Sequence, residues 1–344
     1  MNTDNYCIIL EDKIYSQRTP NSKFTEFTLK GVKVKSYEEL PEEIKTIIDV
    51  NENLQQNPSK YLEYSIKNNE VQINKIKTSI VPYIKIPDTI EECPVIKLGP
   101  RITNYDLLDI TQIQLPDTIR EFSEATFQSS KIKYINTPKN LKTIPKKCFF
   151  DSHIIQFDFS NIEYIDEHAF ESCAELKKAD LSNVKKIERG IFSSCHKLEE
   201  VKLPERLTKI PEFTFYECIS LKKANIPLDA TSIEKFAFYD TAINKINFNA
   251  VVEYIGISAF SHCRQLTELT MPNNLIKIDR RAFAGCGRLS NVILNSELKE
   301  IKSEAFEKTN VRKIIMPENT SYYSDAFPID TKIFLINERD EERY

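Results

Sequence analysis

The sequence predicts a mainly β protein, a solenoid of about ten units of 21–23 residues preceded by a small N-terminal α+β cap. Three observations predict this fold class. A phenylalanine recurs at a nearly constant interval over the last two thirds of the 344 residues, and a short run of branched aliphatic residues follows each phenylalanine. The first eighty residues lack this pattern. A unit of this length cannot bury its apolar side chains alone, so successive units are expected to stack.

Residues 1–80 combine strand-like and helix-like segments and predict a small α+β unit. The stretch 23–35 alternates apolar and polar residues, which indicates a hairpin. A second hairpin is expected over 62–76, turning at Asn68 and Asn69, because asparagine tolerates the left-handed conformation that tight hairpin turns require.

A helix is predicted between these two hairpins. Ser36 and Glu39 have the spacing of a capping box, and Pro41 and three isoleucines follow, so the helix is expected over about 38–55. The whole unit, residues 1–80, either caps the first repeat against edge-to-edge pairing or docks the solenoid onto a larger assembly.

The repeat is defined by a phenylalanine that lies five positions after an aliphatic or aromatic residue. Ten such phenylalanines follow one another: Phe127, Phe149, Phe170, Phe192, Phe215, Phe238, Phe260, Phe283, Phe306 and Phe327. Their spacings are 22, 21, 22, 23, 23, 22, 23, 23 and 21 residues. This regularity predicts a solenoid from about residue 105, ending with a capping strand at 331–337 and a charged tail.

The segment after each phenylalanine has the pattern L-x-x-V-x-L and is often closed by proline, as in 198–204 and 266–272. A short stretch rich in β-branched residues and stopped by proline indicates one brief strand per unit. A second apolar pair, such as Leu207 and Ile210, then leads to the next phenylalanine. No unit has room for a helix of about ten residues as well.

Eight cysteines occur in the chain, and five of them lie three residues after a repeat phenylalanine: Cys173, Cys195, Cys218, Cys263 and Cys286. The next anchor leucine then follows the phenylalanine by six positions. Where Ser or Thr replaces the cysteine, as at Ser152 and Thr241, the anchor follows by five. We infer that the cysteine packs inward at a corner, and that a tighter turn replaces it where it is missing.

Disulfide and metal chemistry remain alternatives for these cysteines. Thiols in consecutive turns would lie about 5 Å apart, within disulfide reach, but isolated buried thiols are common core residues. A zinc site needs four converging ligands. The pairs Cys195–His196 and His262–Cys263 are three units apart, roughly 15 Å, and cannot share an ion.

The complete unit, C-x-x-L-x-x-V-x-L-P-x-x-L-x-x-I-x-x-x-A-F-x-x-C, is best matched by residues 195–218 and 263–286. It resembles the BspA-like (Treponema-type) leucine-rich repeat, and the stretch 86–99 resembles the hairpin that commonly leads into such arrays. The resemblance covers about 80–340 and implies a leucine-rich-repeat solenoid over 81–344. It implies little about function, because the family includes adhesins, surface proteins and many proteins with no known role.

Composition and motifs argue against an enzyme. The net charge of −4 argues against a general nucleic-acid binder, and the six glycines supply no phosphate-binding loop. None of the four histidines lies in HExxH, and no GxSxG occurs. We therefore predict no catalytic, cofactor-binding or metal-binding residues, and no cofactor.

The remaining candidate is the surface of the L-x-x-V-x-L strands. Alternation sends the residues on either side of the central V outward, and these two rows vary in chemistry while the core letters stay fixed. The row before V is Tyr134, Gln156, Lys178, Glu200, Lys223, Lys245, Glu268, Asn291 and Lys313. The row after V is Asn136, Asp158, Asp180, Lys202, Asn225, Asn247, Thr270, Ile293 and Ile315.

These eighteen residues, called the strand face below, are predicted to form a continuous sheet face that binds a partner. The polar centre suits hydrogen-bonded recognition of a protein, or of a glycan as the second choice. Ile293 and Ile315 are neighbours in their row and indicate an apolar contact patch near the C-terminal end.

The predicted function is a non-enzymatic recognition module. The alternative is a structural or attachment component of a cell surface or viral particle, docked through residues 1–80. Residues 1–16 show neither a basic start nor an apolar run of about seven residues, and no stretch approaches the roughly 18–20 apolar residues of a membrane span. We therefore expect a cytoplasmic protein without membrane insertion, with association to a surface or virion as the other option.

Overall fold

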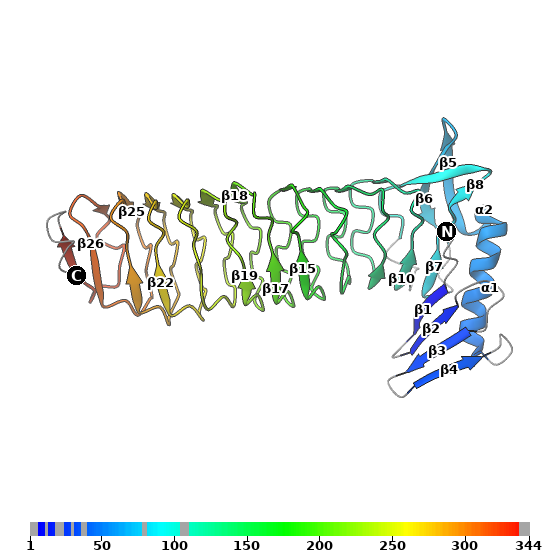
Figure 1. Ribbon diagram of the computed structural model, residues 1–344, viewed down its shortest axis with the longest axis horizontal. Helices are drawn as coiled ribbons and strands as arrows, with labels where there is room; N and C mark the ends of the chain where they lie inside the picture. The colour runs from blue at the N-terminus through cyan, green and yellow to red at the C-terminus, as the bar shows by residue number, and fades with distance from the viewer. Residues whose placement is uncertain are drawn as a thin grey trace.

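The chain forms an elongated solenoid with the N-terminal unit at one end (Figure 1). This architecture is seen in a computed structural model that describes residues 6–10, 13–17, 24–28, 31–35, 40–77, 81–103 and 110–336, with side chains described from Leu40 onward. The charged tail predicted after residue 337 lies outside the described residues.

The chain begins with a four-stranded antiparallel sheet. Its strands are β1 (Tyr6–Leu10), β2 (Lys13–Gln17), β3 (Phe24–Thr28) and β4 (Gly31–Lys35), in that order. Strands β3 and β4 pair antiparallel, which confirms the hairpin predicted over 23–35. The β1–β2 pair was not predicted from the sequence.

Helix α1 (Glu42–Gln56) and the short α2 (Pro58–Tyr61) follow. The predicted helix is confirmed, but it begins later than expected because Pro41 is its N-cap, with a non-helical ψ of 144°. The proposed capping box at Ser36 and Glu39 lies outside the described residues. Helix α1 buries Ile44, Ile47 and Ile48.

The second predicted hairpin is also confirmed. It consists of β5 (Leu62–Lys67) and β6 (Glu70–Ile76), joined at Asn68 and Asn69, whose φ values of 54° and 58° are those that a tight hairpin turn requires. Strand β6 pairs in parallel with β9 (Cys93–Leu98), which forms the expected lead-in hairpin with β8 (Thr89–Ile90). One sheet and one core therefore extend across residue 80, and the division there into two domains stays a prediction.

Helix α1 closes the free edge of the first solenoid strand, β7 (Tyr83–Lys85). The buried Asn51 donates from Nδ2 to the Tyr83 carbonyl at 3.1 Å, and its Oδ1 accepts from the Lys85 amide at 2.6 Å. Gln55 Nε2 donates to the Lys85 carbonyl at 3.1 Å. Side chains thus replace the neighbouring strand that an edge otherwise recruits.

The solenoid has about 11 turns, because β7 and β9 form a turn before the first phenylalanine unit. Most units contain two short parallel strands, on two sides of the solenoid (Figure 1), so the prediction of a single strand was wrong. The second apolar pair forms its own ladder, because its residues are spaced to repeat between units just as the L-x-x-V-x-L residues are.

The first series occupies the L-x-x-V-x-L segments and the C-terminal end: β10 (Gln112–Gln114), β12 (Tyr134–Ile135), β15 (Lys178–Asp180), β17 (Glu200–Lys202), β19 (Lys223–Ala224), β22 (Glu268–Thr270), β24 (Asn291–Ile293), β26 (Lys313–Pro317) and β28 (Lys332–Ile336). The second series comprises β11 (Glu121–Phe122), β13 (Thr143–Ile144), β14 (Tyr164–Ile165), β16 (Lys186–Ile187), β18 (Lys209–Ile210), β20 (Ser232–Ile233), β21 (Tyr254–Ile255), β23 (Lys277–Ile278), β25 (Glu300–Ile301) and β27 (Ser321–Tyr322). Strand β28 confirms the capping strand predicted at 331–337 and pairs with β26.

The ten repeat phenylalanines form the centre of the core, as predicted. Nine are fully buried and Phe327 is 7% exposed. Successive rings lie 5.0–6.2 Å apart, with the closest pairs at 5.0 Å. Each turn therefore contacts the next through an aromatic ring, which gives a solenoid its nearest-neighbour cohesion.

The turn around each phenylalanine uses left-handed backbone at two positions. They lie two residues before and two residues after the phenylalanine, as shown by Phe236 (φ 57°) and Asp240 (φ 51°) on either side of Phe238. The same positions are occupied by residues of many types in other units, including Phe213 and His262. The chain path thus tolerates side-chain variation on the outer surface of these turns.

Candidate binding surface

The strand face has the predicted exposure. None of its eighteen residues is buried, whereas the central positions between the two rows are buried or half-buried. Ile293 is the most unusual member, because 54% of this large apolar side chain is exposed. Recognition by these residues stays a prediction, but all of them are accessible to a partner.

The strand face is not one continuous sheet, and this part of the prediction was wrong. The hydrogen-bonded groups are β7–β10–β12, β15–β17–β19, β22–β24 and β26–β28. No strand forms over 156–158 or 245–247, and β24 does not pair with β26.

Each interruption has a counterpart in the sequence. The units at 156–158, at 245–247 and at β26 carry Ser152, Thr241 and Thr309 at the corner where other units carry cysteine. These units are one residue shorter between the phenylalanine and the next anchor. The Ser130 unit is equally short, yet its strand β12 pairs with β10, so the missing residue accompanies the interruptions but does not by itself prevent the ladder hydrogen bonds.

Several polar side chains of the strand face bond to the backbone. Asn136 bonds to both the amide and the carbonyl of Leu115, and Asn225 bonds in the same way to Leu203. Asp158 and Asp180 accept from backbone amides two residues ahead. These four side chains therefore stabilise the fold. A hydrogen bond from a partner to one of them would add less binding free energy than a bond to a side chain without such a contact.

Two hollows lie on the strand face where the ladder is interrupted. The C-terminal hollow, about 440 Å³, is lined by Ile293, Ile315, Met316, Pro317 and Ile336 and includes Asn291 and Lys313 at its polar side. The middle hollow, about 470 Å³, includes Lys245, Asn247, Glu268 and Thr270. The structure thus gathers eight of the eighteen predicted residues around two concave sites and leaves the other ten outside them.

Asn295 is a lining residue of the C-terminal hollow that the sequence reasoning missed. It is 9% exposed, and its Nδ2 donates to the carbonyls of Asn273 at 3.0 Å and Leu275 at 2.8 Å. Its Oδ1 has no hydrogen-bond partner among the described residues. This buried acceptor is therefore an unsatisfied polar group beside the hollow. The shortened Thr309 corner was the sequence signal that could have located this hollow.

The cysteine ladder packs inward, as predicted. The five corner cysteines are buried, and each thiol donates to the carbonyl of the repeat phenylalanine in the preceding unit, as from Cys195 to Phe170 and from Cys218 to Phe192, both at 3.0 Å. All seven cysteines with described side chains are free. Within the described ranges, no cluster of His, Cys, Asp or Glu is arranged to hold a metal ion.

Burial raises the pKa of four of the five corner thiols, whereas the pKa of Cys263 is lowered because its burial is outweighed by hydrogen bonds from Cys286 and Thr241. The pKa of Cys173 rises to about 12, and the pKa values of Cys148 and Cys195 rise well above the ordinary range, mainly because burial penalises the thiolate. The folded pKa thus lies above the unfolded value. Each thiol with a raised pKa contributes stability that is fully present below about pH 8.5 and is lost as the pH rises above that value.

We expect the corner thiols to be unreactive while the chain is folded. In a variant with Cys7 and Cys93 replaced by serine, the other six thiols should react with an aromatic disulfide reagent at about pH 8 only when about 6 M guanidinium chloride is present. The measurement is the absorbance of the released thiolate. Rapid reaction of the native variant would contradict the inward packing.

Comparisons with known proteins agree with this fold. The family model described as "BspA type Leucine rich repeat region (6 copies)" matches residues 103–222 and 208–333. No curated protein matches the chain significantly. Within the part of the chain that the structure describes, no helix is long and apolar enough to cross a membrane.

Three solved structures that this chain matches are of bacterial proteins. A leucine-rich cell surface protein from Faecalibacterium prausnitzii A2-165 is 23% identical, with 79% of this chain and 86% of that chain covered and a TM-score of 0.47. The pneumococcal vaccine antigen PcpA is 18% identical, with 84% and 94% covered and a TM-score of 0.47. A leucine-rich repeat protein from Bacteroides ovatus ATCC 8483 is 20% identical, with 80% and 98% covered and a TM-score of 0.41.

Leucine-rich-repeat solenoids are generally non-catalytic and typically bind proteins. The family includes surface proteins, which is consistent with a role in recognition or adhesion. The expected cytoplasmic location stays a prediction. Because the family model matches well over half of its residues, this chain belongs to the BspA-type leucine-rich repeat family.

Proposed function

We propose that the protein is a non-enzymatic recognition module that binds a protein partner on the C-terminal half of the strand face. The observation that carries the proposal is the pair of hollows at the interrupted strand ladder, which contain eight of the residues expected to bind. A glycan is the second choice of ligand, because the middle hollow is lined by polar side chains such as Asn247 and Thr270.

The C-terminal hollow favours a protein over a glycan. Its lining combines exposed Ile293 with Ile315, Met316 and Pro317, and such apolar surface gains free energy when a partner's apolar side chain removes it from water. The exposed polar side chains of Asn291 and Lys313 would fix the orientation of that side chain.

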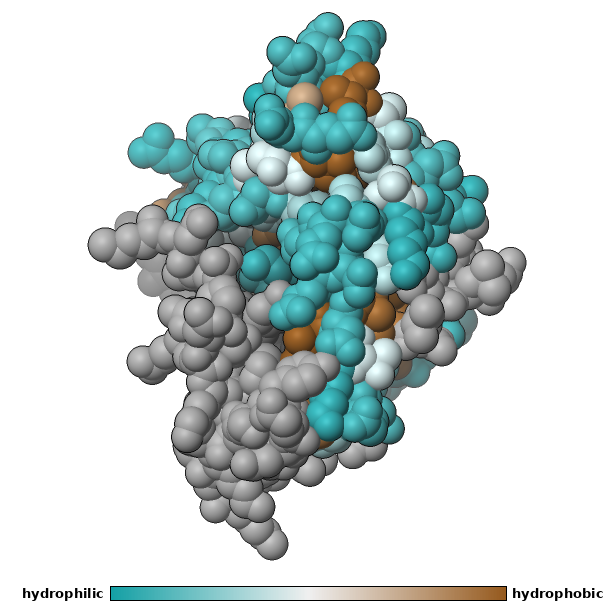
Figure 2. Space-filling model, turned by 90° about the vertical axis from the view of Figure 1, so that its right-hand side faces the viewer, coloured by the Kyte–Doolittle hydropathy of each residue, from teal (hydrophilic) through white to brown (hydrophobic). Residues whose placement is uncertain are grey.

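The alternative, attachment through residues 1–80, receives less support from the described surface. Viewed from the N-terminal end, the described residues are mostly hydrophilic, with small separate apolar patches (Figure 2). Helix α1 already closes the edge of β7 through Asn51 and Gln55. We therefore propose that this unit caps the solenoid, and that the strand face makes the contact with a partner.

Replacing Ile293 with lysine should leave the fold intact and remove partner binding. The side chain is 54% exposed, so a lysine remains solvated, but it places a charge in the apolar contact. The matched control is Ile219→Lys, because Ile219 is also 54% exposed and lies off the strand face. Proteins retained from a source-cell lysate by the immobilised full chain and by the two variants would be identified by mass spectrometry.

The expected result is a set of retained proteins that is shared by the wild type and Ile219→Lys and is lost with Ile293→Lys. Thermal unfolding followed by circular dichroism verifies that both variants are folded. Equal retention by all three proteins would place the binding surface elsewhere.

A further inference from the structure

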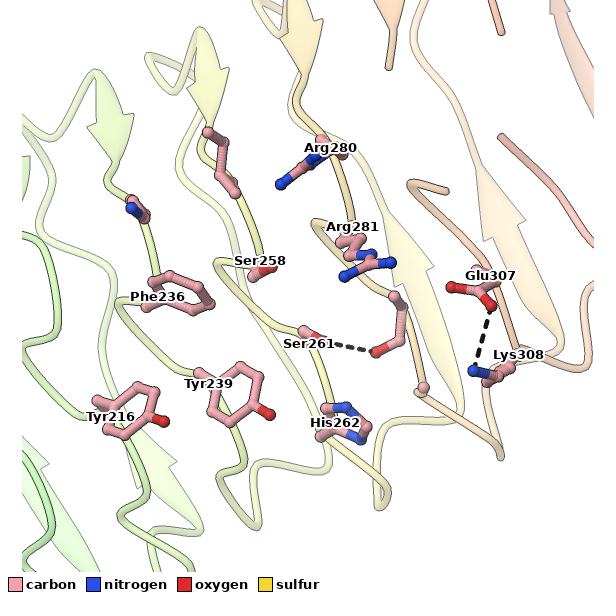
Figure 3. A pocket seen from close by; sticks show the side chains of 14 residues that line it. Tyr216, Phe236, Tyr239, Ser258, Ser261, His262, Arg280, Arg281, Glu307 and Lys308 are labelled. Carbon is pink, nitrogen blue, oxygen red and sulfur yellow. Dashed lines mark hydrogen bonds and ion pairs between the residues drawn. The ribbon is translucent and has the colours of Figure 1, made fainter. Parts of the chain in front are cut away.

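A third hollow, of about 480 Å³, lies away from the strand face, on the turns that carry the core phenylalanines (Figure 3). We call it the turn-side hollow and define it by Phe236, Tyr239, Ser258, Ser261, Arg280 and Arg281. Nothing in the strand-face proposal uses these residues, and the sequence reasoning assigned them no role.

The Phe213–Phe236 column of stacked rings ends at this hollow, whereas Tyr239 contacts the ring of His262 in the next unit at 5.3 Å. Phe213 stacks on Phe236 with ring centroids 5.2 Å apart, and Tyr216 stacks on Tyr239 at 5.0 Å with an interplanar angle of 12°. All four rings are half-buried. They lie at two outer positions that recur in every unit, two residues before and one residue after the core phenylalanine.

In the next unit, serines occupy both of these positions. Ser258 follows Phe236 in the first column, and Ser261 follows Tyr239 in the second (Figure 3). The following unit places Arg281 in the first column. The first column therefore consists of two aromatic rings, a serine and an arginine. The hollow lies where an aromatic ring in place of Ser258 would continue the column.

One turn of the solenoid, the turn of Ser258, separates the turns of Phe236 and Arg281. Neighbouring turns are separated by about 4.8 Å, so the Phe236 and Arg281 positions are about 10 Å apart. A flat ring placed midway would lie about 5 Å from each, within the range of aromatic stacking on one side and of cation–π contact on the other. A planar aromatic group thus fits this space.

The lining is also positively charged. Lys235, Arg280, Arg281 and Lys308 contribute four cations against the single carboxylate of Glu307, in a chain whose net charge is −4. Arg281 pairs with Glu304, and Lys308 pairs with Glu307 at 3.2 Å.

Two of these cations lack an acidic partner. Among the described residues, Lys235 and Arg280 form no ion pair, although the Lys235 Nζ lies 5.2 Å from the centre of the Phe236 ring. An occupant with carboxylates beside its aromatic ring would be complementary to these two cations.

Ser258 provides a polar group at the base of the hollow. The residue is 5% exposed, and its hydroxyl has no hydrogen-bond partner among the described residues. The Ser261 hydroxyl, in contrast, donates to the Ala284 carbonyl at 2.9 Å. The Ser258 hydroxyl is therefore available to a bound group.

We propose that the turn-side hollow binds an aromatic side chain flanked by acidic residues, in a segment of a protein partner. The Phe236 and Arg281 walls select a planar ring, because guanidinium groups stack on flat aromatic faces rather than on puckered sugar rings. A nucleic-acid strand would require phosphate contacts repeated along its length, whereas this hollow accommodates one ring.

The chain contains no tryptophan, which permits a direct test with the full-length protein. The probe is the peptide Asp-Glu-Trp-Glu-Asp, whose tryptophan fluorescence can be excited selectively. We expect its emission to change on titration with the protein. The peptides Asn-Gln-Trp-Gln-Asn and Asp-Glu-Ala-Glu-Asp should bind about tenfold more weakly in competition, because each lacks one of the two features.

Two variants test whether the peptide binds in the turn-side hollow. Ser258→Phe supplies the missing ring, and the backbone accepts it because Phe213 and Phe236 occupy the same column with φ of 57°, near the 53° of Ser258. It should weaken peptide binding about tenfold. Arg280→Gln should weaken binding about fivefold, and the matched control Arg206→Gln, at another exposed arginine, should not.

Several outcomes would overturn the proposal. One is equal binding of the tryptophan and alanine peptides, which would show charge attraction without a ring site. Others are no binding of the acidic tryptophan peptide, or an Arg280→Gln effect no larger than that of Arg206→Gln. Competition by an oligogalacturonate or a single-stranded oligonucleotide that exceeds competition by the peptide would identify a different ligand class and reject a protein segment.

Discussion

Replacement of Phe238 with alanine is expected to lower the free energy of unfolding by about 3–5 kcal/mol. The ring is fully buried and stacks on Phe215 at 5.1 Å and on Phe260 at 5.0 Å. Alanine would remove both contacts and leave a cavity between two turns. In a solenoid each turn contacts only its neighbours, so this cavity weakens the connection between the two halves of the array.

Urea denaturation followed by circular dichroism measures this loss. The matched control is Phe236→Ala, two residues away, because Phe236 is only half-buried on the outer side of the same turn. We expect the control substitution to lower the free energy of unfolding by about 1 kcal/mol. Equal losses for the two variants would contradict a core built on the phenylalanine ladder.

Replacement of Asn51 with leucine is expected to cost about 2–4 kcal/mol. Leucine has a similar volume, but it cannot bond to the Tyr83 carbonyl and the Lys85 amide as Asn51 does. The edge of β7 would lose these partners inside a buried contact, since Asn51 is fully buried. A backbone group left without a partner costs more than the bond contributes when it forms.

The same variant tests the capping role of α1. We expect Asn51→Leu to self-associate in sedimentation experiments at concentrations where the wild type does not, because the β7 edge becomes available for pairing. The matched control is Gln55→Leu, whose exposed side chain donates one bond to the Lys85 carbonyl. Gln55→Leu should lower the free energy of unfolding by less than about 1 kcal/mol. A wild-type-like Asn51→Leu variant would contradict the capping role.

The repeat made most of the fold predictable. The regular spacing of phenylalanine fixes which residue of each unit enters the core, and Phe127 to Phe327 are indeed buried in succession. The two asparagines at 68 and 69 identified their hairpin because few other residues tolerate positive φ at both positions of the turn. The corner cysteines were placed correctly because their loss coincides with a one-residue deletion.

Strand pairing between units was less predictable, because it depends on how two neighbouring units are positioned relative to each other. The second ladder of strands was missed because a two-residue strand with one apolar residue, such as Lys186–Ile187, is too short a pattern to identify from the sequence. The interruptions of the strand face lie in the units of Ser152, Thr241 and Thr309, but the equally short Ser130 unit still pairs, so a single unit does not predict them. The start of α1 was predicted too early because the capping-box pattern was preferred over Pro41.

The candidate sites were predictable in part. Alternation along the strands correctly indicated which residues face outward, and the apolar pair Ile293 and Ile315 lines a hollow as expected of a contact patch. Asn295 and the turn-side hollow could not be identified from the sequence, because they depend on side chains that meet across different units.

The claim that a partner binds the strand face is tested most directly by photo-cross-linking. A benzophenone side chain would replace Ile293 on the strand face, Ile219 off it, and Ile66 in the β5–β6 hairpin, all of which are exposed. Irradiation in source-cell lysate should give a discrete adduct from position 293 and none from 219 or 66. An adduct from position 66 without one from position 293 would contradict the account and favour attachment through the N-terminal unit.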